Sequence, residues 1–136
     1  MLIAAEERAS PMSVKKAYLI LAFASVCVIA LLYGVAPEWF AQTFFGLPQL
    51  GLDFAHILRA MAGLYLALGS FWLYAAFKPH LRNMAVLTTA IFAGGLAVGR
   101  VLSLALDGWP SPLLVLYLAI EVVLVPVAVW VFRRPE

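Results

Sequence analysis

The sequence predicts an all-α integral membrane protein, a four-helix bundle with a short interfacial helix after the first span. The first reason is composition: hydrophobic residues make up 65% of the 136 residues, charged residues only 12%, and the mean hydropathy is +1.02. Soluble domains have roughly 45–50% apolar and about 25% charged residues. The second reason is a set of long apolar runs, each near the roughly 20 residues that cross a bilayer as a helix. A soluble domain, a secreted disulfide scaffold and a disordered chain are therefore excluded.

The apolar runs define a single transmembrane domain over residues 1–136. The spans must be helices, because lipid offers no hydrogen bonds to an open backbone, and no alternating ten-residue pattern predicts a β-barrel. We expect the four spans at residues 17–36, 55–77, 84–106 and 112–132.

The segment 37–47 predicts a short helix of its own. Pro37, followed by an acidic residue, is typical of a helix start. Trp39, Phe40 and Phe44 then recur at helical spacing, which indicates an amphipathic helix in the outer interface. This helix is expected to anchor the chain at the membrane surface or to form a lid over a site between the spans.

The first span is expected to be an uncleaved helix rather than a signal peptide. Its apolar run has full span length, and Pro37 directly follows the small-residue pattern Gly34-Val35-Ala36, where a proline is unfavourable for cleavage. The sequence Met-Ser-Val-Lys-Lys from Met12 is typical of a membrane-protein start. Both Met1 and Met12 therefore remain candidate starts.

Basic residues predict the orientation. Seven of the nine Lys and Arg residues precede the first span, lie between the second and third, or follow the fourth. The loops 37–54 and 107–111 contain none. The positive-inside rule then places both termini in the cytoplasm. A net charge of +2 without a basic patch excludes a nucleic-acid partner, and Cys27 has no second cysteine with which to form a disulfide.

Ionisable residues inside spans are costly and mark candidate sites. Arg59, Arg100 and Glu121 lie about 6, 9 and 14 Å below the outer ends of the second, third and fourth spans. We therefore expect these three residues to meet in the outer half of the membrane, with Asp107 compensating Arg100 from the rim. Three further polar residues share helix faces with them: His56, Ser103 and Tyr117.

Small residues at a spacing of four predict close helix packing. Gly95, Gly99 and Ser103 form such a row in the third span, and Gly63 and Ala67 form another in the second. Rows of this kind allow helix backbones to approach closely within a bundle or between copies. The first row is expected to face another helix rather than lipid.

The polar cluster has three alternative interpretations. It is a structural network that holds the bundle in register, a site for an anionic head group or carboxylate, or a proton-transfer site with Glu121 as acid/base. The spans contain no set of residues at metal-ligand spacing, so no metal site is expected. No phosphate loop, catalytic triad order or zinc-protease motif is present, so no cofactor is expected either.

Two segments resemble a bacterial family of small four-span membrane proteins, catalogued as domain of unknown function 4345. They are Arg59-Ala-Met-Ala-Gly63-Leu-Tyr65 and the specific stretch Gly99-Arg100-Val-Leu-Ser103-Leu-Ala-Leu-Asp107-Gly108. The resemblance covers roughly residues 32–131. It implies the four-span architecture and a bacterial inner membrane, and it implies no activity, because that of the family is unassigned.

The leading functional hypothesis is a non-enzymatic protein with a cationic polar site in the outer leaflet. The site would bind an anionic lipid-like molecule or dock onto a partner membrane protein or a second copy. The alternative is a membrane enzyme that acts on a lipophilic substrate through Glu121. A small transporter is disfavoured, because the sequence has no internal repeat. A binding protein should have a groove open to lipid, an enzyme a closed pocket, and an accessory subunit a flat apolar face.

Overall fold

The computed structural model describes residues 12–136, which form five α-helices and no strand. Residues 1–11, on which the choice between Met1 and Met12 bears, lie outside this range. Four of the helices are long and apolar enough to cross a membrane, so the chain is a multi-pass membrane protein. The helices are α1 (Val14–Val35), α2 (Pro37–Phe45), α3 (Leu52–Ala76), α4 (Pro79–Asp107) and α5 (Pro112–Phe132). The predicted all-α class, the four spans and the short extra helix are confirmed.

Capping residues explain where the helices begin and end. The Ser13 side chain accepts a hydrogen bond from the Lys16 backbone N–H and caps α1 outside the apolar run. The helices α2, α4 and α5 each begin with a proline, which needs no hydrogen-bond partner at that position. Gly46 ends α2 with a φ of 66°, a left-handed conformation that favours glycine. Because caps lie beyond the apolar residues, α1, α3 and α4 begin a few residues earlier than expected.

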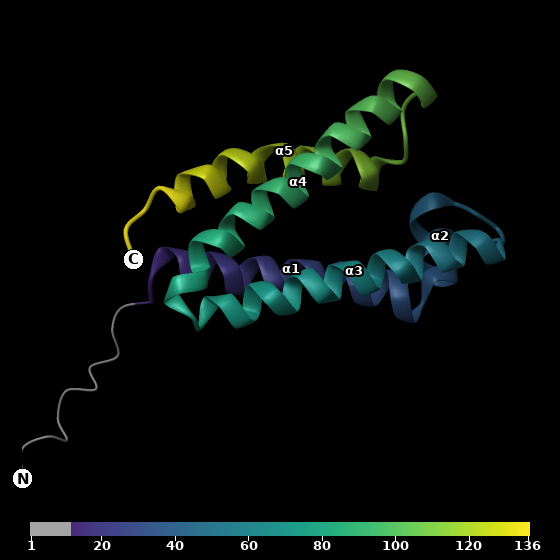
Figure 1. The fold of residues 1–136 in the computed structure, drawn as a ribbon. Coiled ribbons are helices and arrows are strands. Elements are labelled where there is room, and N and C mark those ends of the chain that lie inside the picture. The colour runs from purple at the N-terminus through teal and green to yellow at the C-terminus, as the bar shows by residue number, and fades with distance from the viewer. Residues whose placement is uncertain (1–11) are drawn as a thin grey trace, which may run out of the picture.

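The four long helices form two pairs. Helix α1 packs along α3, and α4 packs along α5, with fewer contacts between the pairs. Figure 1 shows the pairs meeting at the end that carries the start of α1 and the C terminus, and diverging toward α2 and the α4–α5 turn. We call these the terminal end and the α2 end of the bundle. The divergence leaves space between the pairs.

Glycines allow close contact within each helix pair, but these are not the glycines that the sequence predicts. A Cβ placed on Gly69 of α3 would lie 2.8 Å from Cγ2 of Val26, and one on Gly34 of α1 would lie 3.1 Å from Cβ of Ala62. In α4, Gly94 faces α5, where a Cβ would lie 3.7 Å from Cγ2 of Val125. A side chain at Gly69 would collide with α1, and one at Gly34 would fit only if Ala62 shifted by a few tenths of an ångström, so both small residues allow the close approach of α1 and α3.

The expected packing role of Gly63, Gly95 and Gly99 is wrong within this chain. All three are exposed, and no atom lies within 4 Å of a Cβ added to any of them, apart from their own helix backbone. The reason is the rotation of each helix. One residue corresponds to about 100°, so when Gly94 faces α5, Gly95 points away from it.

Charged residues join three segments at the terminal end. Arg82, at the start of α4, donates hydrogen bonds to the Ser13 hydroxyl, the Ala76 carbonyl and Oε2 of Glu136, the last at 2.7 Å. Lys15 is only 3% exposed, and its Nζ lies 3.6 Å from Oε1 of Glu136. The start of α1, the α3–α4 turn and the C terminus are therefore tied together.

At the opposite end, α2 packs onto α1. Phe40 is fully buried, and its ring meets that of Tyr33 edge-on with centroids 4.9 Å apart. Trp39 and Phe44 remain exposed. Helix α2 thus covers the α2 end of α1 with one aromatic residue and turns two others outward.

Candidate functional site

A groove of about 250 Å³ lies between the two helix pairs, and all four long helices line it. Along α1 it extends from Tyr18 to Tyr33, fifteen residues or about 22 Å of helix. Most of the lining is apolar or aromatic. The lining residues are Tyr18, Leu21, Ala22, Ser25, Val26, Ile29, Tyr33, Tyr65, Trp72, Thr89, Phe92, Ala93, Leu96, Arg100, Tyr117, Ile120, Glu121 and Leu124.

The groove opens sideways between α1 and α5. Leu21 and Ser25 of α1 and Ile120 and Leu124 of α5 line the groove and are also exposed. On the opposite wall, the lining residues from α3 are buried. Both rims of the opening belong to apolar helices that are long enough to span a membrane. The opening therefore faces the hydrocarbon of the bilayer.

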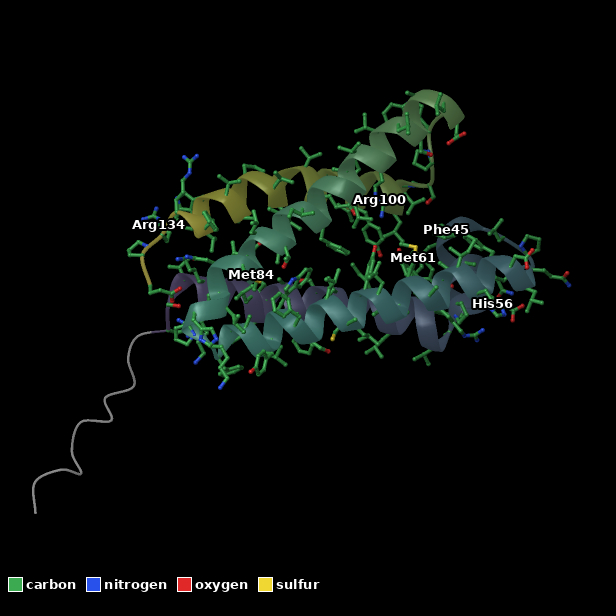
Figure 2. The ribbon with its side chains drawn as sticks, viewed as in Figure 1. Phe45, His56, Met61, Met84, Arg100 and Arg134 are labelled. Atoms are coloured by element: carbon green, nitrogen blue, oxygen red, sulfur yellow. The ribbon has the colours of Figure 1, made fainter. Side chains whose placement is uncertain are left out.

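An ion pair lies toward the α2 end of the groove. Nε of Arg100 donates to both carboxylate oxygens of Glu121, at 2.8 Å to Oε2 and 3.1 Å to Oε1. Glu121 is only 8% exposed. Figure 2 shows Arg100 projecting from α4 into the space between α4 and α3. The predicted contact between Glu121 and one of the two intramembrane arginines is confirmed.

Three tyrosines from three helices surround this pair. Tyr33 of α1, Tyr65 of α3 and Tyr117 of α5 line the groove within electrostatic range of Arg100 and Glu121. The guanidinium carbon of Arg100 lies 5.5 Å from the centre of the Tyr117 ring. We call these five residues the polar site. Each of the four long helices contributes at least one of them.

The polar site has unused hydrogen-bond donors. Only Nε of Arg100 bonds to Glu121, and among the described residues neither Nη nitrogen has a partner. The Arg100 side chain is 20% exposed, and it lines both the groove and a second cavity of about 60 Å³ that contains Ser103. A guanidinium group has five N–H donors, so four remain for water or a bound molecule.

The far end of the groove is polar but satisfied. The Tyr18 and Thr89 hydroxyl oxygens lie 2.7 Å apart, and Thr89 in turn donates to the Val86 carbonyl. Trp72 donates its indole N–H to Thr88 at 3.0 Å. These groups bond to one another and leave the polar site as the end with free donors.

The structure does not bring every predicted residue to the site. Arg59 and His56 are exposed on α3, and His56 lies further toward the start of that helix (Figure 2). Arg59 forms no ion pair within residues 12–136. Asp107 accepts a hydrogen bond from Ser103 at 2.8 Å and does not pair with Arg100. The expectation of a cationic site is therefore wrong for these residues, because the polar site holds one cation and one anion.

Sequence reasoning missed Tyr33, Tyr65 and the aromatic wall beside them. The Phe92 ring contacts both Tyr65 and Trp72 edge-on, with centroid distances of 5.0 and 5.6 Å. Tyrosines within apolar runs are a weak signal, since they also serve as interface anchors. Their spacing to Arg100 becomes visible only once the helices are placed.

Comparison with models of known families matches residues 14–132 to the domain of unknown function (DUF4345). Neither a curated protein nor a solved structure matches the chain.

Proposed function

The chain belongs to the family of the domain of unknown function (DUF4345), which spans nearly all of it, and from this premise we propose that it binds a lipid-like molecule in the groove. In this proposal the hydrocarbon part lies along the apolar lining, and the polar part meets the unpaired Nη donors of Arg100. The family name assigns no activity, so the proposal depends on the geometry of the site.

One observation carries the proposal: the groove opens between α1 and α5 and has its free donors at one end. Binding sites for small molecules are mostly apolar with a few polar groups that fix orientation. A lateral opening gives access from the bilayer, where a lipophilic molecule is dissolved. A site for a water-soluble ligand would instead need an opening at one end of the bundle.

The membrane and its sides are part of the proposal. We assign the protein to a bacterial inner membrane, with both termini in the cytoplasm and the polar site in the outer half. Support comes from the basic residues, six of which lie in described segments at the terminal end: Lys15, Lys16, Lys78, Arg82, Arg133 and Arg134. The positive-inside rule favours the cytoplasm for this end.

The enzyme alternative is less well supported by the geometry. Both oxygens of Glu121 accept from Arg100, so the carboxylate acts as a counter-ion rather than as a free base. The groove is also open rather than closed. Docking on a partner protein would use outer faces, and the groove gives no reason for such a role.

Blocking the groove tests the proposal. Ser25 lies at the rim and is exposed, so Ser25→Trp should fill the opening without disturbing the core. Ala24 is also exposed but does not line the groove, so Ala24→Trp is the matched control. Native mass spectrometry of protein purified in mild detergent should detect a retained lipophilic molecule in the wild type and the control but not in Ser25→Trp. Equal retention in all three proteins, or retention in none, would contradict the proposal.

A further inference from the structure

The charge of the groove carries a statement about its ligand. Arg100 and Glu121 are the only charged residues among its lining residues, and they neutralise one another. A bound anion would leave a net negative charge in a site of low dielectric constant, where an unbalanced charge is costly. A neutral polar group avoids this cost and still accepts hydrogen bonds from the Nη groups.

The hydrogen-bonding groups of the site favour an acceptor. Arg100 supplies unpaired N–H donors, and three tyrosines line the same groove. Donors of this kind match a carbonyl, ester or hydroxyl oxygen. Glu121 can in addition accept from a hydroxyl group, which makes an uncharged oxygen-bearing head group fully compatible with the site.

The size and shape of the groove limit the rest of the molecule. Its volume of about 250 Å³ is below the roughly 300–1,000 Å³ of typical ligand pockets. Its length along α1, about 22 Å, exceeds half of the ~30 Å hydrocarbon thickness. A long and narrow groove suits one hydrocarbon chain and has no room for the two chains of a phospholipid.

We propose that the groove takes an uncharged single-chain amphiphile whose head group presents an oxygen acceptor to Arg100. The inference rests on the proposed function and names the class of its ligand. The chain lies along the aromatic wall formed by Tyr65, Phe92 and Trp72, and it enters between α1 and α5.

Trp72 provides a reporter inside the groove, since it lines the groove and is the only one of the four tryptophans to do so. A protein with the other three replaced by Phe, placed in zwitterionic nanodiscs, reports binding of chain-brominated probes by fluorescence quenching. The probes are a long-chain alcohol, the alkyl sulfonate of equal chain length, and a two-chain phosphatidylglycerol. We expect saturable quenching by the alcohol, with at least tenfold weaker binding of the sulfonate, about 1.4 kcal/mol.

Variants distinguish recognition through the charge of the site from nonspecific binding of amphiphiles. Glu121→Gln gives the site one positive charge, so sulfonate binding should strengthen about tenfold while alcohol binding changes less than threefold. Tyr65→Phe removes one hydroxyl and should weaken alcohol binding severalfold. Arg59→Gln removes a cation outside the groove and should change the affinity for neither the sulfonate nor the alcohol. Circular dichroism and size-exclusion profiles show that each variant is folded.

The outcomes distinguish the two proposals. Preferred saturable binding of the sulfonate or the phosphatidylglycerol would overturn the uncharged single-chain class and leave lipid binding intact. Absence of saturable quenching by every probe would overturn both the ligand class and the proposed function.

Discussion

Arg100 and Glu121, 21 residues apart on neighbouring helices, form an ion pair in which one Nε–H group serves both carboxylate oxygens. The pairing links α4 to α5 and leaves the outer edge of the guanidinium group free. Partial burial makes each member dependent on the other, because an uncompensated charge within a membrane is costly.

Breaking this pair should destabilise the protein more than removing both members. We expect Arg100→Gln to lower the free energy of unfolding by about 3–5 kcal/mol, since it leaves Glu121 without its cation. The double variant Arg100→Gln with Glu121→Gln should recover part of this loss. Thermal unfolding in detergent compares Arg100→Gln, Glu121→Gln and the double variant with the wild type. Arg59→Gln is the control for loss of a cation. Additive losses in the double variant would show that the two residues are not coupled.

Glycine substitutions should separate the packed helix faces from the open ones. Leucine at Gly69 would collide with Val26 and Phe23, so Gly69→Leu should cost about 1–3 kcal/mol. A Cβ at Gly99 would have no neighbour within 4 Å, so Gly99→Leu should leave the unfolding temperature unchanged or raise it slightly. The comparison uses melting curves of the two variants in the same detergent. A larger loss of stability for Gly99→Leu than for Gly69→Leu would show that the closely packed face is that of Gly99 and not that of Gly69.

Labelling with a membrane-impermeant thiol reagent tests the orientation. In a Cys27→Ala background, single cysteines replace Gln49 near the α2 end and Asn83 near the terminal end, both exposed. In intact cells we expect Gln49→Cys to react and Asn83→Cys to be protected until the membrane is opened. The reverse pattern would invert the assignment of the two ends.

The ion pairs at the terminal end should contribute modestly and in a salt-dependent way. Glu136 bonds to Arg82 and lies close to Lys15, but its side chain is 41% exposed. Glu136→Gln should therefore lower stability by about 1 kcal/mol or less, with the difference shrinking at high salt. Paired unfolding curves at low and high ionic strength check this. A loss that does not depend on salt would mean that packing rather than charge holds the three segments together.

The sequence predicts how deep a residue lies in the membrane better than it predicts which face of its helix is buried. The depths of Arg100 and Glu121 follow from counting residues within their spans, and on that basis the sequence predicts a contact of Glu121 with at least one of Arg59 and Arg100. Arg59 has a matching depth, but the buried face of α3 contains Leu58, Ala62 and Tyr65, and Arg59 lies about 100° away from Leu58. Which helices pair, and therefore which face is buried, depends on contacts such as Gly69 with Val26 that no local pattern reveals.

The same limit explains the tyrosines. Tyr33 and Tyr65 are 32 residues apart in apolar runs, and their rings lie 6.1 Å apart only because α1 packs along α3. Tyr117, four residues before Glu121, was predictable because both share one helix. The part of the site within one helix could thus be predicted, whereas the part built across helices could not.

The opening of the groove between α1 and α5 has a consequence for the stability of the purified protein. If the groove binds a lipid-like molecule as proposed, a hydrocarbon chain of the bilayer or of the detergent packs against the interior side chains on this open side. Anything that binds the folded state stabilises it in proportion to the logarithm of its concentration. Measured stability should accordingly vary with the detergent. A detergent whose chain fits the groove should stabilise the folded protein more than one whose chain does not.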